Sequence, residues 1–215
     1  MDFSEQAERI KNKLHKAKEV DNAYKVFGAS DHKYILYPPV NAVQVKKFED
    51  KYSIPLPTCY KAFVLSVGNG GISFQDSGAG PYYGIYPLGE QLDELTDPTY
   101  LNKPCILHPE MSDMAWEELT LPLDDKLISD EDYYNELGRI FSGIMPLGAQ
   151  GCSYLHGLVL NGPCRGKVVN LEMSAEQKPK FAYENNFLDW YERWLDEVIS
   201  GKSPFWFGYS KPEEV

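Results

Sequence analysis

The sequence predicts an α+β fold, in which helices pack on a mostly antiparallel sheet. Apolar residues recur at helical spacing in three segments, near residues 41–52, 57–67 and 186–198. Two strand-like runs, residues 151–160 and 166–171, are separated by a short turn that contains glycine and proline. The chain has 215 residues, of which 43% are hydrophobic, so it can bury a core of ordinary size.

The first 39 residues are expected to form a helical and strand extension that packs on a domain spanning residues 40–215. Asp2 and Glu5 have the spacing of a capping box at the start of a helix. Residues 34–37 are predicted to form a strand that ends before two prolines. The apolar stripe of the first helix consists of Phe3, Ala7, Ile10, Leu14 and Ala17.

The next two helices are marked by their first residues. Asn41 and Gln44 have capping-box spacing. Pro57 suits the first turn of a helix, because the N–H group that proline lacks would have no partner within the helix there. Glycine at position 68 or 70 can adopt the left-handed conformation that ends the second of these helices. A phosphate-binding loop would instead precede a helix, so these glycines indicate a helix end, followed by a strand over residues 72–74.

A further strand is predicted over residues 82–86, before Pro87. Tyr82 and Tyr86 would share one face of that strand and Tyr83 the other, because side chains alternate. All three tyrosines therefore cannot be buried in one core. Tyrosine outside the core favours a protein interface, and Tyr82 and Tyr83 are predicted to bind a partner.

Nearly all the excess negative charge lies in one insert, around residues 110–136. This stretch has ten acidic residues and one basic residue, a net charge of −9, whereas the rest of the chain has 22 acidic and 20 basic residues. Two interpretations remain open: a solvated loop, or a recognition surface for a cationic partner. The acidic residues predicted to contact that partner are Asp124, Asp125, Asp130, Glu131, Asp132 and Glu136.

The C-terminal third is predicted to contain an antiparallel hairpin and a closing helix. The turn of the hairpin occupies residues 161–165. Asn186 can cap the helix, and Gly201 has the position of its C-terminal cap. The aromatic segment 204–207 is expected to pack back on the domain.

The residues favour no catalytic, metal or cofactor site. His156 lies between Cys152 and Cys164, but the spacing matches no common zinc pattern. Residues 162–167 lack the length and the hydroxyl residue of a phosphate loop, and Ser153 is not in a nucleophile elbow. We therefore expect a protein that is not an enzyme.

The composition also limits partners and location. The net charge of −11 argues against direct binding to nucleic acid, which needs clustered basic residues. No apolar run is long enough to cross a membrane, and the charged start lacks the apolar core of a signal peptide. The four cysteines contain no CxxC pair, which favours free thiols in a cytoplasmic protein.

Three motifs in this order resemble those of the SUKH superfamily, over roughly residues 40–200. The first, FEDKYSIPLPTCYKAFVLSVGNGGISF, has an acidic residue after an aromatic, then Leu-Pro and Tyr, and a helix that ends in Asn-Gly-Gly. GCSYLHGLVLNGPCRGKVVNLE resembles the hairpin of that group, and FLDWYERWLDEVISG its closing helix. The matching residues of the first motif are Glu49, Leu56, Pro57, Tyr60, Asn69, Gly70 and Gly71.

The resemblance implies a SUKH-like α+β fold and a protein-binding role without catalysis. The superfamily includes many bacterial immunity proteins as well as fungal regulators of cell-wall assembly and glucan synthesis. The first hypothesis is therefore an immunity protein that binds and neutralises a toxin with a basic domain, such as a nuclease. The alternative is a regulatory scaffold for cell-wall or signalling proteins. The oligomeric state is not predicted.

Overall fold

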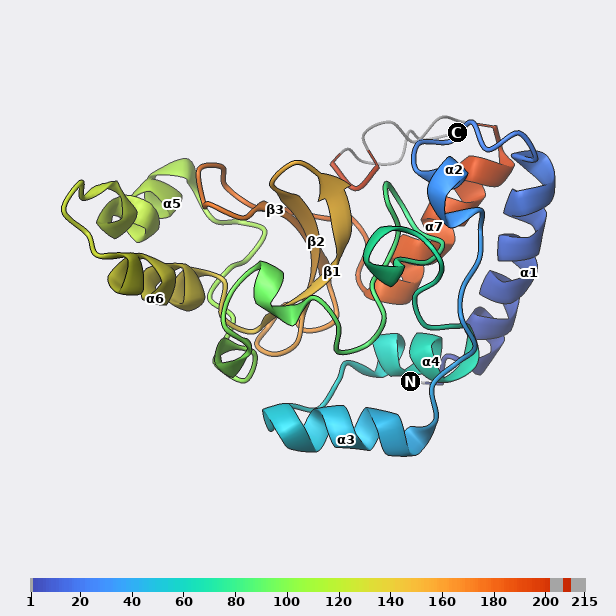
Figure 1. Ribbon diagram of the computed structural model, residues 1–215, viewed down its shortest axis with the longest axis horizontal. Helices are drawn as coiled ribbons and strands as arrows, with labels where there is room; N and C mark the ends of the chain where they lie inside the picture. The colour runs from blue at the N-terminus through green and yellow to red at the C-terminus, as the bar shows by residue number, and fades with distance from the viewer. Residues whose placement is uncertain (1, 202–206, 210–215) are drawn as a thin grey trace.

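The computed structural model describes residues 2–201 and 207–209, and it confirms the predicted α+β fold (Figure 1). The α-helices of this part of the chain are α1 (Ser4–Val20), α2 (Ala29–His32), α3 (Ala42–Tyr52), α4 (Thr58–Ser66), α5 (Asp113–Thr120), α6 (Asp130–Ile140) and α7 (Phe187–Ile199). The strands are β1 (Ile144–Gly151), β2 (Tyr154–Val159), β3 (Val168–Glu172) and β4 (Lys180–Phe181). Short 3-10 helices are η1 (Phe74–Asp76), η2 (Leu92–Glu94), η3 (Pro98–Tyr100) and η4 (Leu121–Asp124).

The four strands form one antiparallel sheet in the order β1-β2-β3-β4. The predicted hairpin is confirmed as β2 and β3, in which His156 pairs with Asn170 and Tyr154 with Glu172. Strand β1 was not predicted as a separate element. It contains Pro146 and two register shifts, which interrupt the regular pattern of a strand.

Both faces of this sheet are covered, so β2 and β3 are buried almost throughout. Leu158 and Val168 belong to a large core on the face that α7 covers. Leu155 and Val169 belong to a second core on the opposite face, which includes Trp116 of α5. Alternate residues of each strand thus stabilise two separate layers.

Helix α7 forms the centre of the larger core. Its predicted cap is confirmed, since the side-chain oxygen of Asn186 accepts hydrogen bonds from the N–H groups of Leu188 and Asp189. Trp190 is fully buried and lies 5.7 Å, ring to ring, from buried Phe207. Phe207 therefore packs back on the domain as expected, whereas residues 204–206 of the same prediction lie outside the described residues.

Helix α1 packs along the outer side of α7 (Figure 1). Ala7, Ile10 and Ala17 are buried, while the other flank of the helix reaches the carboxylate of Glu192. Glu192 accepts hydrogen bonds from Gln6 and Arg9 and forms an ion pair with Lys13 at 3.0 Å. Burial raises the pKa of this carboxyl, but these donors outweigh burial and lower it overall.

The substitution Glu192→Ala is expected to lower the free energy of unfolding by about 1–2 kcal/mol, because Arg9 and Lys13 lose the carboxylate with which both pair. The loss is not larger because both side chains can regain water. Urea unfolding measures this change. The control is Glu19→Ala, which removes an exposed carboxylate that pairs with Lys16 on the same helix. Equal effects from both substitutions would show that Glu192 does not hold α1 on α7.

Helix α4 ends at Ser66, directly before the glycine-rich segment as predicted, but its C-cap, Val67, is in the right-handed conformation. The capping box of Asn41 and Gln44 is confirmed at the start of α3, whereas Pro57 is the N-cap of α4 and lies just before its first turn. Gly70 has φ +65°, and a Cβ there would lie 2.8 Å from the Asp76 carbonyl oxygen. Gly68, the other glycine proposed for this conformation, does not have positive φ.

Four predicted local elements were wrong because the backbone turns where extension or a cap was expected. Tyr34 has φ +56°, so residues 34–37 bend and pair only with nearby loops. After residues 72–74 the chain turns at Gln75 and Asp76, both at φ +54°. Tyr82, at φ +54°, likewise breaks the expected strand 82–86, which retains one isolated bridge between Gly78 and Ile85. The capping box at Asp2 does not form, since α1 begins one residue later and Phe3 is its N-cap.

Candidate functional site

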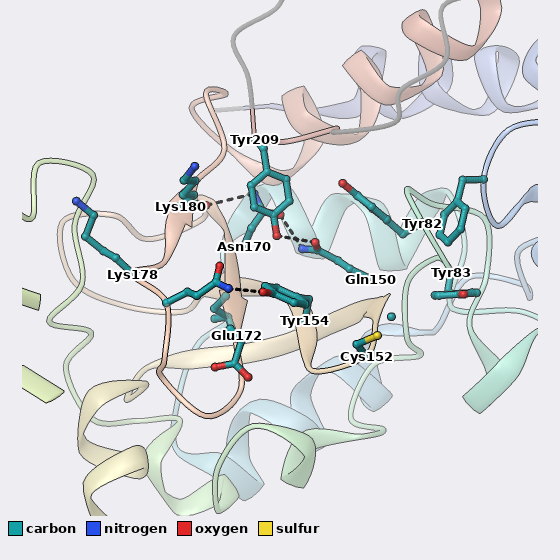
Figure 2. A pocket seen from close by; sticks show the side chains of 14 residues that line it. Tyr82, Tyr83, Gln150, Cys152, Tyr154, Asn170, Glu172, Lys178, Lys180 and Tyr209 are labelled. Carbon is teal, nitrogen blue, oxygen red and sulfur yellow. Dashed lines mark hydrogen bonds between the residues drawn. The ribbon is translucent and has the colours of Figure 1, made fainter. Parts of the chain in front are cut away.

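A cleft of about 700 Å³ lies where β1, β2 and β3 approach the loops around residues 27 and 82 (Figure 2). Its walls are aromatic: Phe27, Tyr82 and Tyr83 come from the N-terminal half, Tyr154 from β2 and Tyr209 from the C-terminal segment. The predicted pair Tyr82 and Tyr83 thus lies in a concave site. Phe27, Tyr154 and Tyr209 were missed, because no local pattern distinguishes them from other tyrosines and phenylalanines.

Tyr82 and Tyr83 are both partly buried, and they are held in place by Phe27. Its ring centroid lies 5.9 Å from that of Tyr82 and 5.2 Å from that of Tyr83, with edge-to-face geometry in both pairs. The Tyr83 N–H donates to the Ala149 carbonyl at 3.3 Å, which anchors this loop to β1. Tyr86 lies apart from them: it is buried, and its hydroxyl donates to Glu94.

Two residues that line the cleft, Gln150 and Asn170, form a buried network with His156. The Asn170 side-chain oxygen accepts from Gln150 Nε2 at 2.9 Å and lies 2.8 Å from His156 Nδ1. The Asn170 amide nitrogen donates to the carbonyl of Gly208, and the Tyr209 hydroxyl donates to Gln150 Oε1. The network therefore ties the wall around Tyr209 to the sheet.

His156 has a structural place in this network. Burial lowers its pKa to about 3, so the imidazole is neutral at neutral pH. Its ring also contacts Trp190, with the two centroids 5.0 Å apart. Within the described ranges, no three His, Cys, Asp or Glu side chains gather to hold a metal ion, and all four cysteines are free.

Charged residues lie on the side of the cleft opposite Tyr82 and Tyr83 (Figure 2). Lys180 is exposed, and its Nζ lies 6.0 Å from the centroid of the Tyr209 ring. Lys178 pairs with Asp113 of α5 and donates to the Met111 carbonyl, which joins the rim to the acidic insert. Glu172 is buried and accepts from the N–H groups of residues 174 and 176, so the exposed charge of this rim is positive.

The acidic insert is helical rather than an irregular loop. It forms α5, η4 and the first part of α6, at the end of the molecule opposite α1 (Figure 1). Trp116 of the insert and Leu137, the next residue after it, are buried in the second core. We call residues 113–136 the acidic arm.

The predicted acidic residues lie mostly on the surface of this arm. Asp132 accepts from the hydroxyl of the N-cap residue Ser129, and the first turn of α6 is stabilised by its three carboxylates. Glu136 pairs with Arg139 at 2.7 Å. The exposed members of the predicted set are Asp124, Asp125, Asp130, Glu131 and Asp132, and Glu136 is partly exposed.

A second cavity, of about 610 Å³, lies between the arm and the segment around η2 and η3. Tyr100, Tyr133 and Tyr134 contribute rings to it, and four acidic residues line it, with no basic residue among those described. The acidic residues are Asp93, Glu94, Asp97 and Glu131. Of these, only Glu131 belongs to the set predicted from sequence, because the other three precede the charged insert.

The residues of the first motif lie outside both cavities, and their contacts are structural. Glu49 accepts from the N–H of Leu56 at 2.7 Å and pairs with Lys61, which closes the loop between α3 and α4. Tyr60 is buried edge-on against Phe187, and the Asn69 side chain accepts from the N–H of Leu88. Leu56 and Pro57 are buried, and Gly70 and Gly71 lie where a Cβ would meet neighbouring backbone.

The fold and these cavities define an α+β domain whose antiparallel sheet is covered on both faces and bordered by two hollows of different charge. The family model described as SMI1 / KNR4 family (SUKH-1) matches residues 39–193, and the chain belongs to this family. Helix α1 lies before the matched region. Neither a search of curated proteins nor a search of solved structures found a match.

The described residues include no helix that is both long and apolar enough to span a bilayer.

Proposed function

We propose that this protein is a non-enzymatic immunity module that binds and neutralises a toxin through a basic domain of that toxin. One observation carries the proposal: the residues with the largest charge excess form an ordered, exposed helical arm. Family membership supports a protein-binding role, either in immunity or in regulation. Residues 1–39 remain, on this proposal, an extension of the binding domain at residues 40–215.

Electrostatics explains how the arm would act. Its exposed carboxylates gather at one end of the molecule, where only Lys126 and Arg139 offset them within the arm and α6. Such a concentration of negative charge accelerates association with a positively charged surface and repels negatively charged surfaces. A nuclease needs a positive groove for phosphate, so an acidic arm seated in that groove would block its substrate.

The helical structure of the arm favours binding energetically. Side chains on a preformed helix lose less conformational freedom on binding than side chains of an unfolded loop. The arm is also fastened to the domain, by Trp116 in the second core and by the ion pair between Lys178 and Asp113. The partner would therefore meet a surface whose carboxylates are already positioned.

The alternative, a regulatory scaffold of cell-wall or signalling proteins, is favoured by the aromatic cleft. Tyr82, Tyr83, Tyr154 and Tyr209 give it the composition of a protein-binding site that does not depend on net charge. A pull-down from the native host at low and then high salt separates the two functions. A single basic partner that elutes with salt indicates immunity, whereas several partners retained at high salt indicate a scaffold.

Neutralising the arm is expected to slow association with the captured basic partner by about tenfold or more at low salt, with a smaller change in dissociation. The variant replaces each acidic side chain with its amide, and stopped-flow or surface-binding kinetics measures the rates. The positions are Asp124, Asp125, Asp130, Glu131 and Asp132.

The control removes the same charge from exposed positions outside the arm. Its substitutions are Glu5→Gln, Glu8→Gln, Glu19→Gln, Asp50→Asn and Glu90→Gln. We expect this control to associate at a rate much closer to that of the unmodified protein, and circular dichroism verifies that both variants are folded. Equal slowing by both sets would show that net charge, rather than the arm, controls association.

A further inference from the structure

We propose that the protein binds an extended segment of its partner in one groove that runs past the turn between β1 and β2, from a basic end at Lys180 to an acidic end at Glu131. The segment would carry a negative side chain near Lys180 and a positive side chain near Glu131. This inference rests on the proposed function and adds the form and charge order of the partner segment.

The groove that we propose joins three adjacent cavities, and each neighbouring pair of cavities shares lining residues. A third cavity, of about 350 Å³, shares Tyr83, Gly151, Cys152 and Tyr154 with the aromatic cleft. The same cavity shares Glu94 and Met173 with the acidic cavity beside the arm. A ligand that leaves the cleft past Tyr83 therefore enters a hollow that continues to the arm.

The size of the groove favours a chain segment over a compact ligand. The two larger cavities, of about 700 and 610 Å³, are each within the range of a complete small-molecule site. An extended polypeptide spans at most about 3.3–3.6 Å per residue and can therefore follow several joined hollows. The aromatic rings along the path offer apolar faces together with hydroxyl groups.

The charges at the two ends determine the orientation of the segment. Lys178 and Lys180 line the first cavity, and because Lys178 is already paired with Asp113, the positive charge of this end is mainly that of Lys180. The single acidic residue among the described lining residues, Glu172, is buried and hydrogen-bonded to backbone. In the acidic cavity Asp93, Asp97 and Glu131 are exposed and no lysine or arginine lies among the described lining residues. A uniformly basic segment would suit only one end of this groove.

Nucleic acid is a poor occupant for the same reason. A phosphate backbone carries the same charge at each step and would place phosphates beside the carboxylates of the acidic end. A polypeptide can reverse its charge within a few residues. The groove therefore favours a protein segment.

The test uses fluorescein-labelled synthetic peptides of roughly ten residues, a length that can extend for about 30 Å. Two peptides have an acidic block and a basic block around a central apolar stretch, in either chain direction. A third has the same composition with alternating charges, and a fourth is uniformly basic. Fluorescence anisotropy with the full chain measures affinity.

Cys152 provides a second readout, because it is the one exposed cysteine and it lies at the middle of the groove. A segment that occupies the groove must cover it and slow its reaction with a thiol reagent. We expect one block peptide to bind about tenfold more tightly than the alternating peptide and to protect Cys152. The preferred block peptide identifies the chain direction.

Charge reversal at one end provides the matched comparison. Lys180→Glu should weaken the preferred block peptide about tenfold, whereas Lys47→Glu on the exposed face of α3 makes the same charge change outside the groove. Both substitutions are at surface positions and should leave the fold intact.

Three results would contradict the proposed groove. In the first, no block peptide binds more tightly than the alternating peptide. In the second, Cys152 reacts with the thiol reagent at the same rate with and without peptide, and in the third, Lys180→Glu and Lys47→Glu change peptide affinity equally. Tight binding of the uniformly basic peptide without protection of Cys152 would also contradict the proposed groove, while leaving the proposed role of the acidic arm intact.

Discussion

Replacing Asn170 by alanine is expected to lower the free energy of unfolding by about 3–5 kcal/mol, because several buried polar groups lose their partners together. Asn170 is 1% exposed, and its side chain joins Gln150, His156 and the carbonyls of Lys180 and Gly208. An alanine leaves a cavity and cannot replace any of these hydrogen bonds. Urea unfolding at pH 7 measures the loss.

The same substitution should also open the aromatic cleft. Residues 207–209 are held to the sheet partly through Gly208 and Asn170, so their protection from hydrogen exchange should fall in the variant. The control is Asn135→Ala, which removes an exposed amide that accepts from the Tyr100 hydroxyl. We expect the control to change stability by less than about 1 kcal/mol. A loss for Asn170 no larger than that of the control would contradict this account of the network.

Acidification is expected to destabilise the fold through two buried histidines. Burial lowers the pKa of His32 to about 4 and that of His156 to about 3, whereas an unfolded histidine has a pKa near 6.5. Below pH 6.5 the unfolded chain therefore binds protons that the folded protein does not. Stability falls as the pH decreases from about 6.5 towards the folded pKa values.

By pH 5 each histidine should cost roughly 2 kcal/mol relative to neutral pH, so that the pair accounts for about 4 kcal/mol. Urea midpoints at pH 7, 6 and 5 measure this trend, and NMR should show both imidazoles still neutral in the folded protein at pH 5. His15→Gln on the exposed side of α1 should keep the full dependence. His32→Gln should reduce it, because one of the two titrating groups is removed. A stability that does not change between pH 7 and 5 would contradict the prediction.

Both predictions concern residues whose importance is not visible in the sequence. His156 lies on β2, whereas its partners Gln150 and Asn170 lie on β1 and β3. Hydrogen bonds between residues distant along the chain depend on strand register. That register brings His156 opposite Asn170.

The acidic insert, in contrast, was recognisable from the sequence. Its charge excess was evident from composition, and the structure adds that it is helical and exposed. Asp93 and Asp97 were not included in the predicted set, because they precede the insert by more than ten residues. They line the same cavity as Glu131 only because the chain returns past the sheet.

The sequence by itself determined the fold class, the hairpin of β2 and β3, the capped helices α3 and α7, the stop after α4 and the location of the negative charge. These features depend on neighbours within a few residues, such as Asn186 with the N–H groups of the first turn of α7. Tertiary structure decided that residues 34–37, 72–74 and 82–86 are not strands, and it assembled the groove. A groove requires residues from Phe27 to Tyr209 to meet, and their meeting depends on long-range packing that no local pattern encodes.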